Sequence, residues 1–537
     1  MSGGYVLGVN WWFHDGAAAV VDPAGNVLWM AEEERFTRHR HGWGEFPVAA
    51  VAAGLAETGV DREEISLVAV GWQPWLANHP SGQAWRPSYA DPAVLAQDLL
   101  GWDRLPAGCT FSFFDHHDAH AASAFYASPF DDAAVLVVDG HGERASVSIH
   151  RGGRRTGITP VECYPRPFSL GYFYEAATRH LGFRLLEAGK TMGLASYALA
   201  AEPLFAFADG IPPGARALRA DCTWDEAATA WGTWFQDTYG PVSTPTACLH
   251  RDPLAVRIAA QAQATVAAEL ARLVARAREL TGLDAVCIGG GVAQNCVAMG
   301  AVDEPVYVPP FAHDAGVSLG AAWLTTGGPV LPQGVSPYLG AQTQPRTADQ
   351  LAGWMSVDYT PDLVADLLRC GQVGAVYTGR AEVGARALGH RSVIARPDDT
   401  AVRDRVNRMK GREPWRPLAP AGLAECDGVF WDSRGSRSRY MTASAPMTDL
   451  GRSSLPGATH VDGTCRMQVV RETGVVHDVL RALRGGGHDP VVLNTSFNDR
   501  GDPIAHAGAD VAAAAERMGL DFLVWDDELL RPAGGPR

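Results

Sequence analysis

The sequence has nine cysteines in 537 residues but no Cys-x-x-Cys pair. Scattered cysteines of this kind are unlike a zinc knuckle or a disulfide framework, so we expect reduced thiols and a cytoplasmic location. No apolar run approaches the roughly 20 residues of a membrane span. The N-terminal stretch also lacks the basic start and apolar core of a signal peptide. We therefore expect no membrane partner.

Positive charge is also scarce. The 45 Lys and Arg residues face 60 Asp and Glu residues, which gives a net charge of −15. A surface that binds nucleic acid regardless of its sequence needs a basic field, so we expect no nucleic-acid partner. The hydrophobic content of 47% is ordinary for a soluble enzyme, and 537 residues exceed what one core accommodates. The sequence leaves the oligomeric state open, a homodimer included.

Residues 116–120 have the sequence His-His-Asp-Ala-His. On a helix, a spacing of four places His116 and His120 on one face, one turn apart, where both can bind one metal ion. Asp139 follows an apolar segment that we predict to be a buried strand, and a parallel sheet presents active-site groups at this end of its strands. The alternative is that both histidines are core or helix-capping residues.

Residues 4–31 and 133–157 share one pattern. Each begins with an apolar strand that ends in a turn containing His and Gly, and continues as a hairpin around a tight turn, DPAGN in the first and HRGGR in the second. This repeat predicts an α/β domain made of the duplicated halves of the actin–sugar kinase–Hsp70 architecture, in which a nucleotide or activated group lies between the halves. The alternative is a chance similarity of two hairpins.

Three further segments organise the chain. Residues 253–281 predict a packing helix, because they start with Pro, carry an apolar stripe and end before a glycine. Residues 283–300 predict a strand, a triple-glycine turn and a helix start, which brings backbone N–H groups close to a phosphate or serves as a packing turn. A Pro/Gly-rich stretch at 325–346 predicts a boundary. We therefore expect domains at 1–335 and 345–537.

Nine motifs follow one another between residues 116 and 498: HHDAHAASAFYASPF, VVDGHGE, EAGKTMGLASY, CIGGGVAQNCVAMG, FAHDAGVSLGAA, GARALGHRS, KGREPWRPLAP, DGTCRMQ and NTSFN. With HDGAAAVV and EEERFTR near the start, this series resembles the O-carbamoyltransferase family, which includes the nodulation-factor, cephalosporin and tobramycin carbamoyltransferases. The resemblance covers nearly the whole chain.

The resemblance implies a first domain similar to the tRNA-threonylcarbamoyl transferase and a second, YrdC-like α/β domain. It also implies a two-step reaction. The second domain forms carbamoyl-adenylate from carbamoyl phosphate and ATP, which is used with Mg(II). The first domain then passes the carbamoyl group to a hydroxyl of a small-molecule acceptor, such as an antibiotic or a sugar-containing metabolite.

The resemblance adds Asp314 to His116, His120 and Asp139 as a fourth metal ligand, and the family uses iron. Two imidazoles and two carboxylates suit a borderline divalent ion such as Fe(II), Mn or Zn, which would polarise the carbamoyl carbonyl. Asp314 also precedes a small-residue helical pattern, so its alternative role is that of an N-cap.

Other residues are candidates for substrate contacts in the first domain. His14 and Asp15 follow the first strand and are either the base that deprotonates the acceptor hydroxyl or turn-forming residues. The remaining candidates for nucleotide or phosphate contacts are Lys190, Gly290, Gly291, Asn295, Arg38 and Arg40. Lys190 can instead end a helix, and at Arg40 relatives often carry Lys.

In the second domain, carbamoyl phosphate and the ATP triphosphate require several cations around one site. Guanidinium groups bind phosphate oxygens bidentately, which favours Arg. The candidates come from three segments and are Arg386, Arg391, Lys410, Arg412, Arg416 and Arg466. By resemblance, Arg386, Arg416 and Arg466 match carbamoyl-phosphate positions, while the nucleotide contacts are Thr464, Ser496 and Asn498. A solvated basic face is the alternative.

The acceptor is not identified by the sequence. Aromatic side chains in loops bind sugar rings and polyketide faces, or they cover a core. Those in residues 42–111 are Trp43, Trp72, Trp75, Trp85 and Trp102. The segment around residues 200–250, which contains DCTWDEAATAWGTWFQDTYG, is the other candidate for acceptor selection.

Three alternative functions remain. One is tRNA-threonylcarbamoyl transfer, which the acidic charge disfavours. Another is a nucleotide-binding regulator of the Hsp70 type, which would not need a carbamoyl-phosphate site. The third is carbamoylation of an acceptor nitrogen.

Overall fold

The computed structural model describes residues 4–11, 13–76, 85–329 and 334–534. The chain divides into two compact units, residues 1–339 (unit 1) and 340–537 (unit 2). The division falls within the segment 325–346 that the sequence marks as a boundary, although residues 330–333 of that segment lie outside the described residues.

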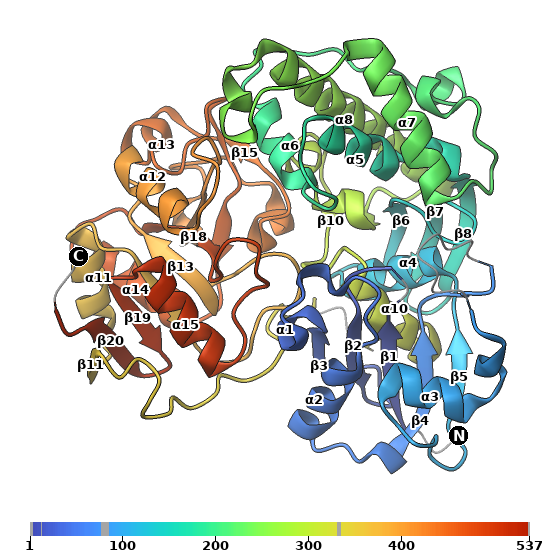
Figure 1. The fold of residues 1–537 in the computed structure, drawn as a ribbon, viewed down its shortest axis with the longest axis horizontal. Coiled ribbons are helices and arrows are strands. Elements are labelled where there is room, and N and C mark those ends of the chain that lie inside the picture. The colour runs from blue at the N-terminus through green and yellow to red at the C-terminus, as the bar shows by residue number, and fades with distance from the viewer. Residues whose placement is uncertain (1–3, 12, 77–84, 330–333, 535–537) are drawn as a thin grey trace. The chain divides into compact units, whose positions relative to one another are not determined.

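Unit 1 contains two sheets built on the same plan, each of five strands among the described residues (Figure 1). The orders are β3-β2-β1-β4-β5 and β8-β7-β6-β9-β10. In each sheet the first three strands form an antiparallel meander, and the fourth strand is parallel to the first. The strand pairing therefore confirms the predicted duplication. The bounds are β1 Tyr5–Asn10, β2 Ala17–Val21, β3 Val27–Glu32, β4 Ile65–Val70, β5 Thr110–Phe113, β6 Asp132–Val138, β7 Val147–Gly153, β8 Gly157–Tyr164, β9 Val286–Gly289 and β10 Val306–Tyr307.

The second hairpin turns later than the sequence predicts. Most of HRGGR lies inside β7, which pairs with β6 as far as Gly153, and the turn follows at residues 154–156. The reason is packing. A Cβ atom at Gly152 would lie 2.7 Å from the ring of Phe125, so this glycine allows a helix to approach the sheet rather than making a turn.

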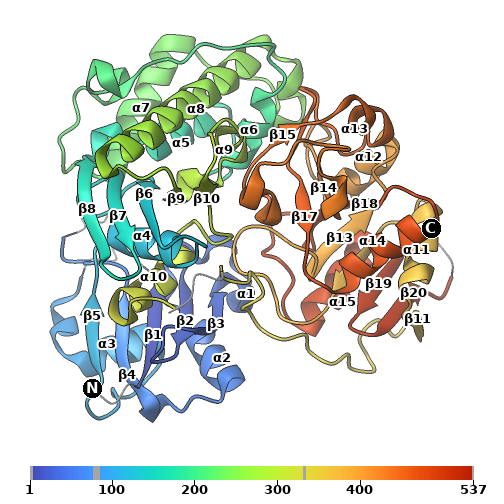
Figure 2. The ribbon, with the colours of Figure 1, turned by 180° about the vertical axis from the view of Figure 1, so that it is seen from behind.

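Two helices made largely of small residues, α4 (His116–Tyr126) and α10 (Ala315–Thr326), pack against each other between the sheets (Figures 1 and 2). Helix α4 contacts β6 and β9, whereas α10 contacts β1 and β2. Their approach is close enough that a Cβ atom on Gly320 would lie 1.8 Å from the carbonyl oxygen of Ala119. This crossing places the start of each helix in the interior of unit 1.

The outer faces of the sheets carry other helices. Helix α2 packs on β2 and β3, and α8 packs on β6 and β7 (Figure 2). Helix α8 has the predicted bounds, with Asp252 capping its first turn and Gly282 ending it at φ 67°. None of the helices in the described part of the chain combines the length and the apolar content that a transmembrane segment requires. The remaining bounds in unit 1 are α1 Glu34–Thr37, α2 Val48–Thr58, α3 Pro92–Leu100, α5 Leu170–His180, α6 Ala188–Ala195, α7 Trp224–Tyr239, α8 Pro253–Thr281 and α9 Cys296–Gly300.

Unit 2 is a mixed α/β unit. Its main sheet has the order β11-β20-β19-β12-β13-β18-β14-β17, with both parallel and antiparallel neighbours. One apolar core surrounds this sheet and the helices on it. The bounds are β11 Trp354–Asp358, α11 Pro361–Arg369, β12 Gly374–Tyr377, β13 Arg391–Ala395, α12 Thr400–Met409, β14 Ala419–Leu423, β15 Ala445–Pro446, α13 Asp449–Ser454, β16 Thr464–Cys465, β17 Gln468–Val470, α14 Val475–Gly485, β18 Val491–Ser496, α15 Gly508–Met518, β19 Phe522–Trp525 and β20 Glu528–Pro532.

The crossing of α4 and α10 makes a testable prediction. Gly320→Ala should lower the free energy of unfolding of unit 1 by about 1–3 kcal/mol, because the added methyl group overpacks the crossing. The control is Gly232→Ala in α7, where a Cβ atom meets nothing within 4 Å. That change should instead add roughly 0.5–1 kcal/mol, through the helix preference of Ala over Gly. Calorimetry of the full chain measures both. Equal midpoints for the two variants would contradict the close crossing.

Candidate active site

The four predicted metal ligands lie together in the interior of unit 1. They come from the start of α4, the end of β6 and the residue before α10, and all four are buried: His116, His120, Asp139 and Asp314. The Nε2 atoms of the two histidines are 3.1 Å apart. The Asp139 Oδ2 atom lies 3.4 Å from Nε2 of His116 and 3.7 Å from Nε2 of His120. The Asp314 Oδ1 atom lies at 3.7 and 3.4 Å from the same two nitrogens.

These distances fit one metal ion. Donor atoms about 2.1 Å from a common ion lie roughly 3.0 Å apart at right angles and 3.4 Å apart at tetrahedral angles. The donor set also fits, since two imidazole nitrogens and two carboxylates suit a borderline divalent ion. We conclude that the buried cluster could hold a divalent transition metal. The spacing of the donors does not distinguish iron from manganese or zinc.

Neighbouring groups orient the His116 ring. Its Nδ1 atom lies 3.2 Å from the carbonyl oxygen of Gly71, which follows β4, so Nδ1–H donates there and Nε2 is left to face the cluster. The ring of Trp72 stacks on the imidazole at a centroid distance of 3.7 Å.

A backbone amide orients Asp139 in the same way. Its Oδ1 atom accepts a hydrogen bond of 2.7 Å from the N–H of Gly291, which leaves Oδ2 for the cluster. That turn needs glycine at position 290, where φ is 91° and a Cβ atom would lie 2.3 Å from the Val138 oxygen.

Asp314 occupies the N-cap position of α10, but its side chain makes no capping hydrogen bond. Its two oxygens face different groups instead. Oδ1 faces the two histidines, and Oδ2 lies 3.9 Å from Nδ1 of His14. The position therefore favours a ligand over a cap.

The pKa values of the metal-free cluster are set by burial and by the closeness of its two histidines and two aspartates. Burial lowers the pKa of His116, but Asp314 and Asp139 outweigh burial and raise it to about 10. Burial raises the pKa of Asp139, but the two histidines outweigh it and hold that pKa well below its usual range. In the metal-free chain a proton on His116 therefore compensates the carboxylates.

The predicted base lies next to the cluster. Nδ1 of His14 is 2.9 Å from Oδ2 of Asp15, and the other Asp15 oxygen lies 3.0 Å from Nδ1 of His41. Asp15 adopts φ 52°, a conformation that aspartate tolerates better than most residues. Burial lowers the pKa of His14, but Asp314 and Asp15 outweigh it and raise it to about 9. The His14 side chain is 24% exposed, whereas those of His116 and His120 are fully buried.

The other predicted nucleotide contacts of unit 1 are engaged within the protein. The N–H of Gly290 donates to Ala312, and Asn295 caps α9 and exchanges hydrogen bonds with Gln263. Lys190 pairs with Glu187 at 2.7 Å.

Two arginines near the N-terminus complete the candidates of unit 1. Arg38 is half-buried and adopts φ 62°, while Arg40 is exposed. Contacts of any of these residues with a nucleotide stay predictions.

In unit 2, three of the predicted arginines interact electrostatically: Arg412, Arg416 and Arg466. Burial and the charges of Arg416 and Arg466 lower the pKa of Arg412 well below its usual range, with Glu413 acting in the opposite direction. The Nε atoms of Arg412 and Arg466 are buried and have no hydrogen-bond partner among the described residues. The positive charges of these guanidinium groups repel one another, and an anion bound beside them would relieve the repulsion.

The other cationic candidates differ in role. Arg391 lies 4.2 Å from the Tyr377 ring centroid, and its guanidinium donates to backbone carbonyls that include those of Gly379 at 3.0 Å and His390 at 3.1 Å. Arg391 thus stabilises the loops around β13, and its predicted phosphate contact stays a prediction. Arg386 lies half-buried between β12 and β13.

The remaining residues of unit 2 that we predicted to contact the nucleotide or phosphate form hydrogen bonds within the protein. Lys410 joins the end of α12 to the exit of β18, since its Nζ atom donates to the backbone and side-chain oxygens of Asn498 at 2.8 and 3.1 Å. Ser496 donates to the same side chain. Thr464 donates to Asp462 at 2.7 Å.

Comparison with known proteins gives the family. The model of the carbamoyltransferase N-terminus matches residues 103–323, and that of the carbamoyltransferase C-terminus matches residues 365–531. An uncharacterised protein of Synechocystis is 32% identical over 99% of this chain and 97% of its own length. The nodulation protein NolNO of Sinorhizobium fredii is 30% identical over 97% of this chain and 79% of its own length. The chain belongs to the carbamoyltransferase family.

A named enzyme is among the relatives. The 3′-hydroxymethylcephem-O-carbamoyltransferase of Amycolatopsis lactamdurans is 27% identical over 97% of this chain and 98% of its own length. The resemblance found in the motifs is therefore confirmed at the level of the family, and this carbamoyltransferase is a transferase enzyme, as predicted.

The candidate tryptophans of this carbamoyltransferase differ in exposure, and their contact with an acceptor stays a prediction. Trp72 and Trp102 are core residues, and Trp85 packs against the same core. Trp43 and Trp75 are 45% and 51% exposed. Trp43 also stacks on His14 at a centroid distance of 5.8 Å, so it offers an aromatic face beside the predicted base. Residues 77–84, within the same predicted segment, lie outside the described residues.

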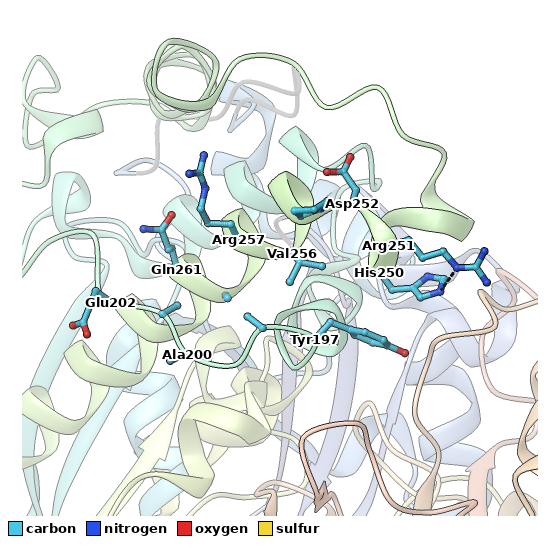
Figure 3. A pocket seen from close by; sticks show the side chains of 13 residues that line it. Tyr197, Ala200, Glu202, His250, Arg251, Asp252, Val256, Arg257 and Gln261 are labelled. Carbon is cyan, nitrogen blue, oxygen red and sulfur yellow. Dashed lines mark hydrogen bonds between the residues drawn. The ribbon is translucent and has the colours of Figure 1, made fainter.

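A separate open pocket of about 550 Å³ lies at the start of α8 (Figure 3). Its lining mixes acidic and basic side chains, including Glu202, Arg251 and Arg257, with the ring of Tyr197. Both ends of the candidate segment around 200–250 reach this pocket, through Glu202 and His250, and α7 lies in the middle of the segment. Tyr239 at the end of α7 donates to the lining residue Gln261 at 2.9 Å. No predicted catalytic, nucleotide or metal residue lines this pocket, so it is distinct from the cluster.

The charge balance of the cluster predicts how metal binding depends on pH. Because the pKa of His116 is raised to about 10, metal binding at pH 7 must displace its proton. The affinity for Zn(II) should therefore rise by about tenfold per pH unit for each proton displaced, and level off near pH 10. Calorimetry in buffers of different ionisation enthalpy measures the released protons. An affinity that does not change between pH 6.5 and 8.5 would contradict this charge balance.

Proposed function

We propose that this carbamoyltransferase is an ATP-dependent O-carbamoyltransferase acting on a hydroxyl of a small-molecule natural product. Unit 1 would carry out the transfer. Unit 2, proposed to be a YrdC-like domain, would form carbamoyl-adenylate. The observation that carries the proposal is that one chain holds both a buried cluster of two histidines and two aspartates and, in the other unit, a group of arginines suited to an anion.

The activation step would take place in unit 2. Water would hydrolyse carbamoyl phosphate to carbamate and inorganic phosphate. An oxygen of the carbamate would then attack the α-phosphorus of ATP, and pyrophosphate would leave. Arg412, Arg416 and Arg466 would hold the phosphate groups, since their mutual repulsion falls when an anion lies among them. Lys410, Ser496 and Asn498 lie around one strand exit and are the proposed ATP contacts, with Mg(II) carried by the nucleotide.

The transfer step would take place in unit 1. A bound Fe(II), or another divalent transition metal, would polarise the carbamoyl carbonyl. His14 would accept the proton of the acceptor hydroxyl, while Asp15 holds its imidazole in place. The acceptor oxygen would attack the carbamoyl carbon, and AMP would leave. The raised pKa of His14, about 9, describes the metal-free protein, in which Asp314 faces it without a metal ion.

Three alternative functions differ from this proposal, two in the acceptor of the carbamoyl group and one in having no group transfer. Transfer to an acceptor nitrogen would use the same groups, and only acceptor assays separate it from O-carbamoylation. Transfer to tRNA is disfavoured by the net charge of −15. A nucleotide-driven regulator would need no cluster of arginines for carbamoyl phosphate. Cytoplasmic location and the choice between monomer and homodimer stay predictions.

His120→Ala should lower carbamoyl transfer by at least about 100-fold, because it removes a ligand of the metal that stabilises the developing charge. Pyrophosphate release from ATP should persist, since the groups proposed for adenylation are on unit 2. Transfer is measured by mass spectrometry on hydroxylated antibiotics and sugars. His180→Ala, a change outside the cluster, is the control. If His120→Ala lost both steps equally, the proposed division of labour would be wrong.

Arg466→Ala should have the opposite effect. Removing one of the grouped guanidiniums should slow formation of carbamoyl-adenylate by about 100–1,000-fold and leave transfer from supplied carbamoyl-adenylate intact. Arg369→Ala, on the exposed surface of α11, should change neither step. A variant at Arg466 that cannot use the supplied intermediate would remove this residue from the proposed phosphate site.

A further inference from the structure

Glu143 ends the motif VVDGHGE, in which only Asp139 has a role so far. It lies in the connection between β6 and β7, and 6% of the residue is exposed. A buried carboxylate is costly unless its oxygens accept hydrogen bonds. The contacts of these two oxygens therefore indicate what the side chain does.

Each oxygen accepts a hydrogen bond from a different backbone N–H group. Oε1 accepts from Gln73 at 2.6 Å, and Oε2 accepts from His116 at 2.9 Å. Gln73 follows β4 in the first half of unit 1, and His116 is the first residue of α4. One carboxylate thus joins three segments that are far apart in the sequence.

The same three segments surround His116. The segment after β4 supplies the Gly71 carbonyl that accepts from Nδ1, and the Trp72 ring that stacks on the imidazole. The connection after β6 begins with Asp139, four residues before Glu143. Arg166 holds that connection in turn, by donating to the carbonyl oxygen of Glu143 at 2.8 Å.

We propose that Glu143 is a positioning residue of the candidate metal centre. Its carboxylate fixes the start of α4 and the segment after β4 relative to the connection that carries Asp139, so that Nε2 of His116 faces the Asp139 carboxylate. This role rests on the metal centre of the proposed function. Glutamine cannot replace Glu143, since it has one acceptor oxygen and turns an NH₂ group toward the second N–H. Aspartate keeps both oxygens but is one methylene too short to reach both donors.

The test uses the full-length, metal-stripped protein and Co(II) as the probe, because its visible absorption reports the coordination of the ion. Affinity is measured by competition with a chelator at pH 8, above the pKa of Glu143, which burial raises to about 7. The variants are Glu143→Gln and Glu143→Asp. The matched control is Glu269→Gln on α8, a glutamate that is 1% exposed and pairs with Arg272 away from the cluster.

Both Glu143 variants should bind Co(II) about 10–100-fold more weakly, the usual effect of removing a group that orients a ligand, and should change its visible spectrum. Glu269→Gln should alter neither, even where its thermal midpoint falls as far as theirs. Wild-type affinity and spectrum in the Glu143 variants would overturn the role of Glu143 alone. If Glu143→Gln does not fold, Glu143→Asp decides by the same criterion. A wild-type protein that binds no Co(II) would overturn the metal centre and the role of Glu143 together.

Discussion

Two imidazoles and two carboxylates share one buried position, and the candidate active site of this carbamoyltransferase depends on how they are kept there. Groups of this kind are expensive to bury unless a proton or a metal ion compensates them. The duplicated fold makes the position available. It crosses two small-residue helices between two sheets of equal strand order, so that two helix starts and one strand end meet. The two Nε2 atoms then lie 3.1 Å apart, and each lies 3.4–3.7 Å from an oxygen of each carboxylate.

A second constraint applies in unit 2. There three arginines lie with one glutamate, Glu413, and burial together with the neighbouring arginines lowers the pKa of Arg412. The cluster in unit 1 offers nitrogen and oxygen ligands to a metal cation. The arginine group in unit 2 offers N–H groups to an anion. This contrast supports two different chemical steps in one chain more strongly than either group does alone.

The parts of the site that follow local periodicity were predictable from the sequence. The helical spacing of His116 and His120 placed both on one face of α4, and the apolar run before Asp139 placed this residue at the end of a strand. The bounds of α8 followed from its proline, its apolar stripe and its glycine. In each case the determining residues are close together in the sequence.

The contacts that orient the ligands were not predictable, because they join distant segments through backbone groups. The Gly71 carbonyl and the Gly291 N–H are backbone groups, so no side-chain type in the sequence indicates their contacts. The same limit explains the misplaced turn, since Gly152 serves the packing of Phe125 from another element. The backbone hydrogen bonds of Arg391 were likewise not predictable from the sequence, because their acceptors are carbonyl groups. Glu143 stood within a recognised motif, but only the fold brings Gln73 to it.

The proposed function requires one chain to activate a carbamoyl group with ATP and then to transfer it. The most direct measurement is the release of pyrophosphate and AMP from ATP by the Fe(II)-loaded, anaerobic protein, with and without carbamoyl phosphate and without an acceptor. Pyrophosphate should be released only when carbamoyl phosphate is present, and AMP should follow as water hydrolyses the carbamoyl-adenylate. Release of ADP, or no pyrophosphate with carbamoyl phosphate present, would contradict the adenylation step and favour a nucleotide-driven regulator.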